Sequence, residues 1–303
     1  MWALFGVVVT VMLALDLKVF NRRAHEIKLA EAVLWSCIWI ILSLAFGVGV
    51  WFELGQEPAM KFLTGYVIEK ALSMDNLFVF LIIFSYFRIP LEYQHKVLFW
   101  GIVGALFFRA IFIAAGVTLI GMFSWTIYVL GAFLVFTGIK LAFQKDAEFD
   151  PEQNVGIRIF RRFFPVTHEY DGDRFFAMRN GVRAATPLFI ALIVIETTDI
   201  VFATDSIPAI LGITTDTFLV YSSNIFAILG LRAMYFVLAG VMGMFRFMHY
   251  GLSLILVFVG VKMLAGNWLH MTVSVELGIV MMVLMLSVFI SILVPEKKTP
   301  DSE

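Results

Sequence analysis

The stretch LFIALIVIETTDIVFATDSIPAIL (188–211) decides the fold, because it has the composition of a membrane-spanning helix and yet contains three carboxylates. They belong to Glu196, Asp199 and Asp205. Ionisable groups near the middle of a bilayer are costly, so they face the protein interior, pair with one another and mark functional paths. The stretch therefore predicts a membrane protein with a buried acidic site.

Composition supports a membrane location for the whole chain. Of its 303 residues, 61% are hydrophobic and only 15% are charged, whereas charged residues make up about a quarter of an ordinary soluble domain. That balance excludes a soluble domain and predicts a polytopic membrane protein. Because Cys37 is the only cysteine, an intrachain disulfide is excluded as well.

Hydropathy predicts an all-α membrane domain that covers residues 1–303. Apolar segments long enough to cross a bilayer give nine expected spans, at 2–20, 32–54, 61–84, 97–120, 123–143, 186–211, 218–243, 250–268 and 272–294. The first segment lacks a basic region before its apolar run, so we expect a retained span and not a signal peptide.

Basic residues predict the orientation and the role of the polar segment 144–185. Lysines and arginines gather in alternate loops, which places the N-terminus outside and the C-terminus in the cytoplasm. The segment 144–185 is then a cytoplasmic connector at the membrane surface, and docking of a protein partner is the alternative. The pair Asp171-Gly172 within it predicts a tight hairpin.

An internal repeat is visible in the apolar segments. YVLGAFLVFTGIKLAF (128–143) recurs as YGLSLILVFVGVKMLA (250–265), and SMDNLFVF (73–80) matches TTDIVFAT (197–204). The unit is three spans, repeat one at 61–143 and repeat two at 186–268, with the remaining spans peripheral. Since three is odd, the copies enter the membrane from opposite sides, an architecture in which binding sites lie near the midplane between repeats.

The repeat pairs charged residues with one another. Asp75 corresponds to Asp199, and Arg109 corresponds to Arg232. The expected interior carboxylates exceed the expected interior cations by two charges; the full set is Glu69, Asp75, Glu196, Asp199 and Asp205 against Lys70, Arg109 and Arg232. Such an excess suits one divalent cation or two exchangeable protons, and competition between them favours antiport.

The candidate ligands are hard oxygen donors. Carboxylates, hydroxyls and the Asn76 amide suit Mn²⁺, Mg²⁺ or Ca²⁺ better than Zn²⁺ or Cu⁺. Asn224 is ambiguous, because its amide can bond to the backbone or face the cavity as a ligand or gate. Nearer the span ends, we expect Lys262 to reach the membrane surface and Glu276 to be hydrated.

Pro208 predicts a helix break. A proline removes one backbone hydrogen bond and clashes with the preceding turn, so we expect an unwound or kinked segment near Thr204–Pro208. Asp205 lies six residues after Asp199, a rotation of about 240° on an intact helix. The break would bring Asp205 toward Asp199, and the alternative is that Asp205 lines the outer mouth.

Three segments resemble the signatures of the TerC family, in its Alx-type branch. They are SMDNLFVF, ATPLFIALIVIETTDIVFATDSIPAI and SSNIFAILGLRAMYF, and the resemblance runs from about Ala71 to Lys262. It implies a bacterial inner-membrane protein of the LysE-like transporter superfamily, linked to Mn²⁺ export, metal homeostasis, tellurite resistance and alkaline response. The resemblance also places the five interior carboxylates on the acidic positions of the family.

These observations favour a secondary transporter that exports Mn²⁺ in exchange for protons, with no organic cofactor and no nucleic-acid partner. A membrane enzyme with a carboxylate pair is the weaker alternative, since a carboxylate pair alone specifies chemistry poorly. A further alternative is an accessory protein that passes metal to exported enzymes. We therefore expect no enzymatic activity.

Overall fold

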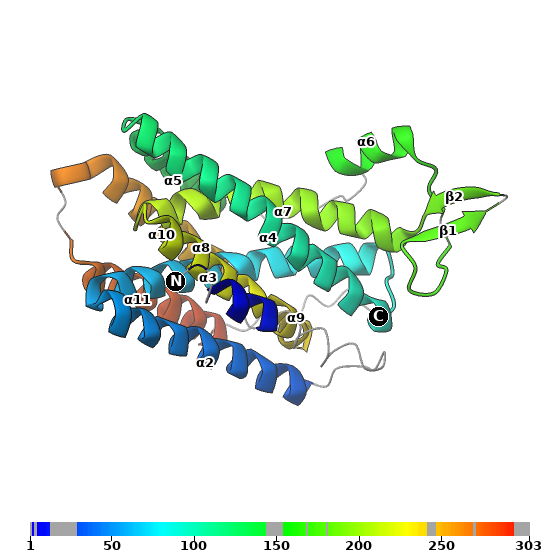
Figure 1. Ribbon diagram of the computed structural model, residues 1–303, viewed down its shortest axis with the longest axis horizontal. Coiled ribbons are helices and arrows are strands. Elements are labelled where there is room, and N and C mark those ends of the chain that lie inside the picture. The colour runs from blue at the N-terminus through cyan, green and yellow to red at the C-terminus, as the bar shows by residue number, and fades with distance from the viewer. Residues whose placement is uncertain are drawn as a thin grey trace.

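The computed structural model describes residues 2, 5–12, 29–143, 154–167, 169–179, 181–240, 247–268 and 271–293. Long helices form an elongated bundle, and a small hairpin projects from one end (Figure 1). Helices suit a membrane because they satisfy every backbone polar group within the segment. The chain is thus an all-α membrane protein apart from this hairpin.

The elements follow the apolar runs of the sequence. The helices are α2 (Leu29–Leu54), α3 (Gln56–Tyr86), α4 (Leu91–Met122), α5 (Thr126–Phe143), α6 (Val155–Phe163), α7 (Pro187–Leu211), α8 (Thr217–Leu229), α9 (Leu231–Gly240), α10 (Met248–Ala265) and α11 (Val273–Leu293). The strands are β1 (Phe176–Arg179) and β2 (Val182–Ala185), and a short 3-10 helix, η3, covers Gly266–Trp268.

Within the described residues, six helices are long and apolar enough to cross a membrane, or seven spans if α8 and α9 form one. The six are α2, α4, α5, α7, α10 and α11. A multi-pass protein is confirmed, with six or seven candidate spans among the described residues, where nine were expected over the whole chain. The expected span 2–20 lies largely outside the described residues, and α3, although 31 residues long, is too rich in charge to qualify by hydropathy.

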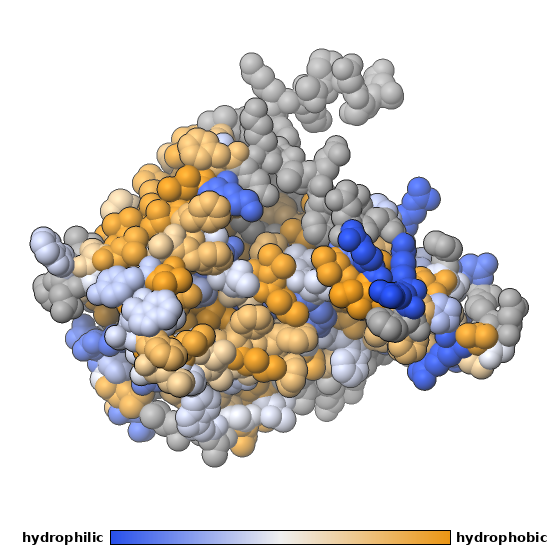
Figure 2. Space-filling model, turned by 90° about the horizontal axis from the view of Figure 1, so that it is seen from above, coloured by the Kyte–Doolittle hydropathy of each residue, from blue (hydrophilic) through white to orange (hydrophobic). Residues whose placement is uncertain are grey.

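Helix α3 lies inside the bundle (Figure 1). It packs against α2, α7, α8, α9, α10 and α11. Its Glu69 is fully buried and so faces protein and not lipid, as a charged group inside a membrane must. The outer helices instead expose large apolar side chains, such as Phe52 on α2 and Phe136 on α5. Figure 2 shows apolar side chains over most of the visible face, with the largest hydrophilic group toward the hairpin end.

Helices α5 and α10, which carry the recurring sequence, pack against each other through small residues. A Cβ at Gly260 would lie 2.7 Å from the Gly131 carbonyl oxygen, and the Ser253 hydroxyl donates to the Gly138 carbonyl at 2.6 Å. Small residues let helix backbones approach closely in membranes. The inverted relation between the two halves, and the domain limits drawn from it, remain predictions.

The helix break lies in a different span from the one expected. Helix α7 is continuous through Pro208, so the predicted unwound segment is wrong. Pro208 is close to the end of α7, where the Gly212 N–H still donates to the Pro208 carbonyl at 2.9 Å, and a single helical bond to Thr204 is lost. The break occurs instead at Gly230, where α8 and α9 meet at 40°.

Helix α3 ends in an unusual residue. The Arg88 N–H donates to the Ser85 carbonyl at 3.0 Å, and the Ile89 N–H donates to the Phe84 carbonyl at 2.9 Å. This pattern is the Schellman motif, whose left-handed position usually holds glycine. Here the position holds Arg88, with φ of 50°, a conformation that costs an arginine about 1 kcal/mol or more.

The segment between α6 and α7 folds onto the bundle. Strands β1 and β2 pair antiparallel on either side of residues 180–181. The pair Asp171-Gly172 forms a turn, in which the Arg174 N–H donates to the Asp171 carbonyl at 3.1 Å, but it does not join the strands. The expected hairpin position is therefore wrong, and the Asn-Gly pair at 180–181 is the sequence signal that marks the loop.

Two contacts tie this segment to the spans. Lys96 of α4 pairs with Asp173 at 2.9 Å, and the ammonium group holds the pKa of Asp173 below its ordinary value. The Tyr170 hydroxyl donates to the Phe87 carbonyl at 2.6 Å. The connector thus lies against the ends of α3 and α4.

Candidate functional site

Arg109 of α4 joins two carboxylates inside the bundle. Its side chain is 1% exposed, and its Nη2 lies 3.0 Å from Oδ1 of Asp199 on α7, while its Nε donates to Oδ2 at 3.3 Å. Nη1 of the same guanidinium pairs with Oε1 of Glu69 on α3. The two-point contact with Asp199 is the geometry in which arginine binds carboxylate most strongly.

Hydroxyl groups complete this cluster. Nη1 of Arg109 donates to the Ser206 oxygen at 3.3 Å, and the Ser73 hydroxyl donates to Glu69 Oε1 at 3.3 Å. Glu69 is fully buried, and its second oxygen has no hydrogen-bond partner among the described residues. Helices α3, α4 and α7 therefore meet at a cluster of ion pairs. One carboxylate oxygen of this cluster, Oε2 of Glu69, remains available as a metal ligand.

Glu196 lies one helical turn before Asp199 and packs against α4. A methyl group at Gly104 would overlap the Glu196 carboxylate, so this glycine makes room for it. Oε2 of Glu196 is buried and has no hydrogen-bond partner among the described groups. The glycine at 104 is a residue that charge-based reasoning missed, and no pattern in the sequence distinguishes it from the other glycines.

Asn76 was predicted as a ligand, and Asn224 was left open between a bond to the backbone and a place in the cavity. Asn224 on α8 is fully buried, and neither its nitrogen nor its oxygen has a partner in the described part of the chain. Asn76 on α3 is 3% exposed. The Asp75 side chain lies outside the described residues. Asn224 is thus a buried side-chain amide that makes no hydrogen bond to the described residues.

Asp205 does not join the central cluster. The polar groups beside its carboxylate are Thr137 and Lys140 of α5, and its Oδ1 has no hydrogen-bond partner among the described residues. Because α7 is intact, the rotation of about 240° from Asp199 is preserved. The expected approach of Asp205 to Asp199 is therefore wrong.

The other predicted basic residues lie elsewhere. Lys70 donates from Nζ to the Ala227 carbonyl, near the end of α8, at 3.0 Å. Arg232 on α9 is 2% exposed and lines a cavity with His95 and Lys96 of α4. Of the described cations, Arg109 is the one that bonds to Glu69 and Asp199.

A buried ion pair at the end of α7 was not predicted. Lys262 of α10 lies 2.5 Å from Glu276 of α11, which is 1% exposed, and Lys262 also donates to the Gly212 carbonyl at 3.2 Å. The expectation that Glu276 is hydrated is therefore wrong. Charges near span ends look alike in sequence whether they are hydrated or paired.

The described residues contain no cluster of three or more histidine, cysteine, aspartate or glutamate side chains arranged to hold a metal. The geometry above explains this result, because Arg109 takes up the carboxylates of Glu69 and Asp199, and Asp205 faces α5. In this conformation the single positive charge of Arg109 is shared between the carboxylates of Glu69 and Asp199.

The sequence pattern described as "Integral membrane protein TerC family" matches residues 54–299. The chain belongs to the TerC family. A Myxococcus xanthus relative, "Uncharacterized membrane protein STKORF319", is 50% identical over 303 residues, which cover 100% of this chain and 95% of the relative. This relative is therefore similar to the chain over nearly its full length.

Two further relatives are bacterial. The Escherichia coli (strain K12) protein named "Putative membrane-bound redox modulator Alx" is 45% identical over 300 residues, covering 96% of this chain and 94% of the relative. A Rickettsia bellii protein named "Uncharacterized membrane protein" is 39% identical, covering 96% of this chain and 97% of the relative. No solved structure matches the chain.

Proposed function

We propose that this TerC protein is a secondary transporter that exports a divalent metal, Mn²⁺, from the cytoplasm in exchange for protons. The observation that carries the proposal is the buried cluster of Glu69, Arg109 and Asp199. Intramembrane charges of this kind are expensive and mark ion pathways. The interior position on three helices is where a transported ion has to be held.

Arg109 has a defined part in the proposal. A guanidinium keeps its charge, so Arg109 supplies a fixed positive charge beside Glu69 and Asp199 when no metal is bound. An arriving cation competes with Arg109 for both carboxylates. The unused oxygens of Glu69, Glu196 and Asn224 then supply further ligands, which are the hard donors that Mn²⁺, Mg²⁺ and Ca²⁺ accept. The family resemblance selects Mn²⁺ among these.

Protons complete the cycle. A buried carboxylate that has lost its arginine partner favours the protonated form. Metal and protons therefore compete for the same carboxylates, and binding of one releases the other. The distribution of basic residues supports an inner-membrane orientation with the N-terminus outside and the C-terminus in the cytoplasm.

The alternative functions receive less support. An accessory protein that passes metal to exported enzymes requires the same ligands but no path through the membrane. The name of the Escherichia coli relative refers to redox modulation, whereas this chain has a single cysteine, Cys37, so an intrachain dithiol is excluded. The carboxylate cluster favours cation handling over both.

Proteoliposomes with an imposed pH gradient test the proposal. We expect the purified protein to move Mn²⁺ in the direction opposite to the proton flow, with Mg²⁺, Ca²⁺ and Zn²⁺ tested in parallel. Abolition of flux on collapse of the gradient supports exchange. Mn²⁺ binding without any flux would favour the accessory role.

The position of Glu196 offers a finer test. Gly104→Ala should displace the Glu196 carboxylate with little loss of stability, because the overlapping atoms end a flexible side chain. We expect weaker Mn²⁺ binding in this variant. Gly121→Ala on the same helix is the control, since a Cβ there meets nothing within 4 Å. Equal Mn²⁺ binding in both variants contradicts a ligand role for Glu196.

A further inference from the structure

Helix α6 lies along the half of α7 that is nearer the hairpin (Figure 1). Ile157 of α6 is 1% exposed, and the rings of Phe160 and Phe189 lie 5.2 Å apart between their centroids. At the start of α6, a Cβ on Gly156 would overlap Oγ1 of Thr197. The two helices therefore run antiparallel, with the start of α6 beside Thr197 and its later residues beside Phe189.

This arrangement places the start of α6 at the depth of the bilayer. Helix α7 has 25 residues and is one of the helices able to cross a membrane. At about 1.5 Å per residue, Thr197 lies about 15 Å along the helix from Pro187, and an apolar layer about 30 Å thick covers most of α7. The side of α6 that faces away from α7 therefore meets lipid at the start of the helix.

The outward face of α6 combines apolar and basic side chains. Val155, Arg158, Ile159 and Arg162 are all exposed. Their spacing of three, four and seven residues puts them on one face of the helix, and this face is opposite the buried Ile157. We call these four residues the outward face of α6.

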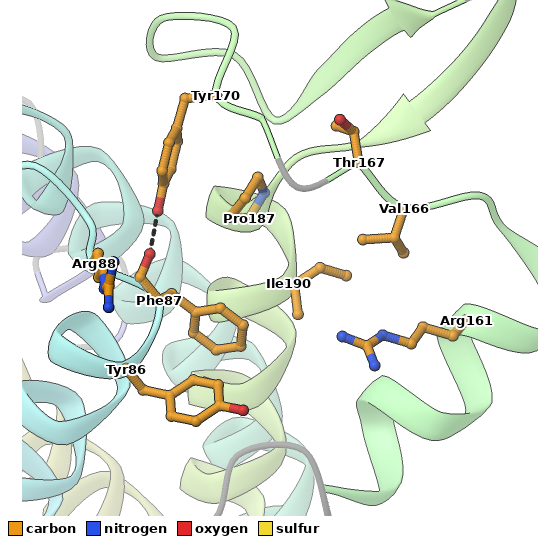
Figure 3. Close-up of a pocket in the computed structure, with 9 residues that line it drawn as sticks. All are labelled: Tyr86, Phe87, Arg88, Arg161, Val166, Thr167, Tyr170, Pro187 and Ile190. Atoms are coloured by element: carbon orange, nitrogen blue, oxygen red, sulfur yellow. Dashed lines mark hydrogen bonds between the residues drawn. The ribbon is translucent and has the colours of Figure 1, made fainter.

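The third arginine of α6, Arg161, is not part of the outward face. Figure 3 shows Arg161 extending toward Ile190 of α7, where it lines a cavity of about 370 Å³. Arg158 and Arg162 are thus the arginines that α6 presents away from the bundle. Because α6 contains no acidic residue, no carboxylate of the helix itself offsets their charge.

We propose that the outward face of α6 binds anionic phospholipids in the membrane leaflet at the hairpin end of the bundle. Val155 and Ile159 lie among acyl chains. Arg158 and Arg162 extend to the phosphate groups, since long basic side chains bury their stems in apolar surroundings and keep the charge in the polar layer. Anionic lipid attracts basic amphipathic helices of this kind. The inference does not depend on the transport proposal.

A soluble protein is the other class of partner for such a face. The depth of the start of α6 favours lipid, because a soluble protein would have to displace lipid from beside α7. The charge of the face favours anionic over neutral lipid, because two arginines are presented by a helix without an acidic side chain.

A spin label at residue 159 of the full-length protein in lipid nanodiscs tests the proposal. Cys37 is the only cysteine of the chain, so Cys37→Ser combined with Ile159→Cys leaves one labelling site, on the outward face. Collisions of the label with oxygen, which enters lipid, and with a nickel chelate, which stays in water, report whether residue 159 lies in the bilayer. Nanodiscs of phosphatidylglycerol and of phosphatidylcholine are compared.

The decisive variant adds Arg158→Gln and Arg162→Gln to this labelled protein. Both side chains are exposed, so the melting temperature should not fall. Arg174→Gln combined with Arg183→Gln is the matched control, since it removes two exposed arginines of the connector that lie outside α6. A further variant, Arg158→Lys with Arg162→Lys, keeps both charges on the outward face.

In phosphatidylglycerol, we expect the label to lie in lipid in the parent protein, in the control and in the lysine variant. The glutamine variant should lower the ratio of lipid-embedded to water-exposed label by roughly 25-fold, about fivefold for each arginine. Phosphatidylcholine should lower this ratio in the parent protein as well.

Two results would overturn the proposal. A label that lies in water in both lipids shows that the outward face does not bind the membrane, and leaves it to a soluble partner. A label that lies equally deep in both lipids, or in the folded glutamine variant, shows that the face does not select anionic lipid through its arginines.

Discussion

The C-terminal ends of α7 and α8 each accept a hydrogen bond from a lysine, but the two lysines differ in their carboxylate partners. At each, a lysine from a neighbouring helix donates to a backbone carbonyl, Lys262 to Gly212 at 3.2 Å and Lys70 to Ala227 at 3.0 Å. Cations near helix C-termini are favourable because the last carbonyls lack partners. Lys262 also pairs with Glu276, whereas no described carboxylate pairs with Lys70.

The end of α7 is straight in the sense that the helix is unbroken, whereas the chain bends directly after the end of α8. Helix α7 contains a proline and stays intact, while the chain bends at Gly230 after α8, without a proline. A buried cation lacking a carboxylate partner is costly, so the α8 end is the less stable of the two. We therefore expect movement during a transport cycle at Gly230 and not at Pro208.

The largest effect should come from Arg109, which ties α7 to α3 and α4. Arg109→Gln leaves Glu69 and Asp199 buried without their partner, and removing one member of a buried ion pair costs about 3–5 kcal/mol. Reversible unfolding in detergent micelles measures the loss. Adding Glu69→Gln should recover part of it, and a full-stability single variant would show that the pairing does not hold α7.

Next in size is the ion pair at the end of α7. Glu276→Gln leaves Lys262 without its carboxylate, and we expect a loss of about 1–3 kcal/mol in the free energy of unfolding. The control is Glu57→Gln, which breaks the exposed Glu57–Lys61 pair at a cost of about 0.5 kcal/mol or less. Equal losses in the two variants would remove the distinction between the helix ends.

Lys70→Met should change stability less than Glu276→Gln does. The substitution removes the bond to the Ala227 carbonyl but also removes a buried charge, and these effects oppose each other. We expect a net change within about 1.5 kcal/mol and faster hydrogen exchange at the amides around Gly230. A loss larger than that of Glu276→Gln contradicts the view that the α8 end is the weaker one.

The smallest effect should come from Pro208→Ala. The variant restores one helical hydrogen bond in an intact helix, so stability should change by about 1 kcal/mol or less and Mn²⁺ flux should be unchanged. Flux measured in proteoliposomes decides the point. A strong decrease in Mn²⁺ flux with normal stability would show that the transport cycle depends on the region around Pro208 in α7.

The residues of the buried ion-pair cluster were largely predictable, because charged residues are rare within apolar segments of the sequence. Glu69, Arg109 and Asp199 stand out in sequence for that reason, and the structure brings them together. Which arginine pairs with which carboxylate was not predictable, because it depends on helix rotation. The position of Asp205 was misjudged because a proline near a helix end costs only one hydrogen bond.

The fold likewise has some features that were predictable from the sequence and others that were not. Span positions follow hydropathy, and the hairpin follows an Asn-Gly pair that a weaker Asp-Gly signal obscured. The bend at Gly230 was not predictable from the sequence. The glycine is needed there because a Cβ would lie 2.7 Å from Lys70 Nζ and 3.1 Å from Trp39 Cβ. Such contacts arise only from tertiary packing.

The most direct test of the central claim is Mn²⁺ flux in proteoliposomes that contain equal amounts of folded Asp199→Asn or Glu57→Gln protein. Asp199 shares Arg109 with Glu69 in the buried cluster, whereas Glu57 is exposed on the same helix as Glu69. The account predicts that Asp199→Asn abolishes flux and that Glu57→Gln retains the wild-type rate. Undiminished flux through Asp199→Asn would contradict it.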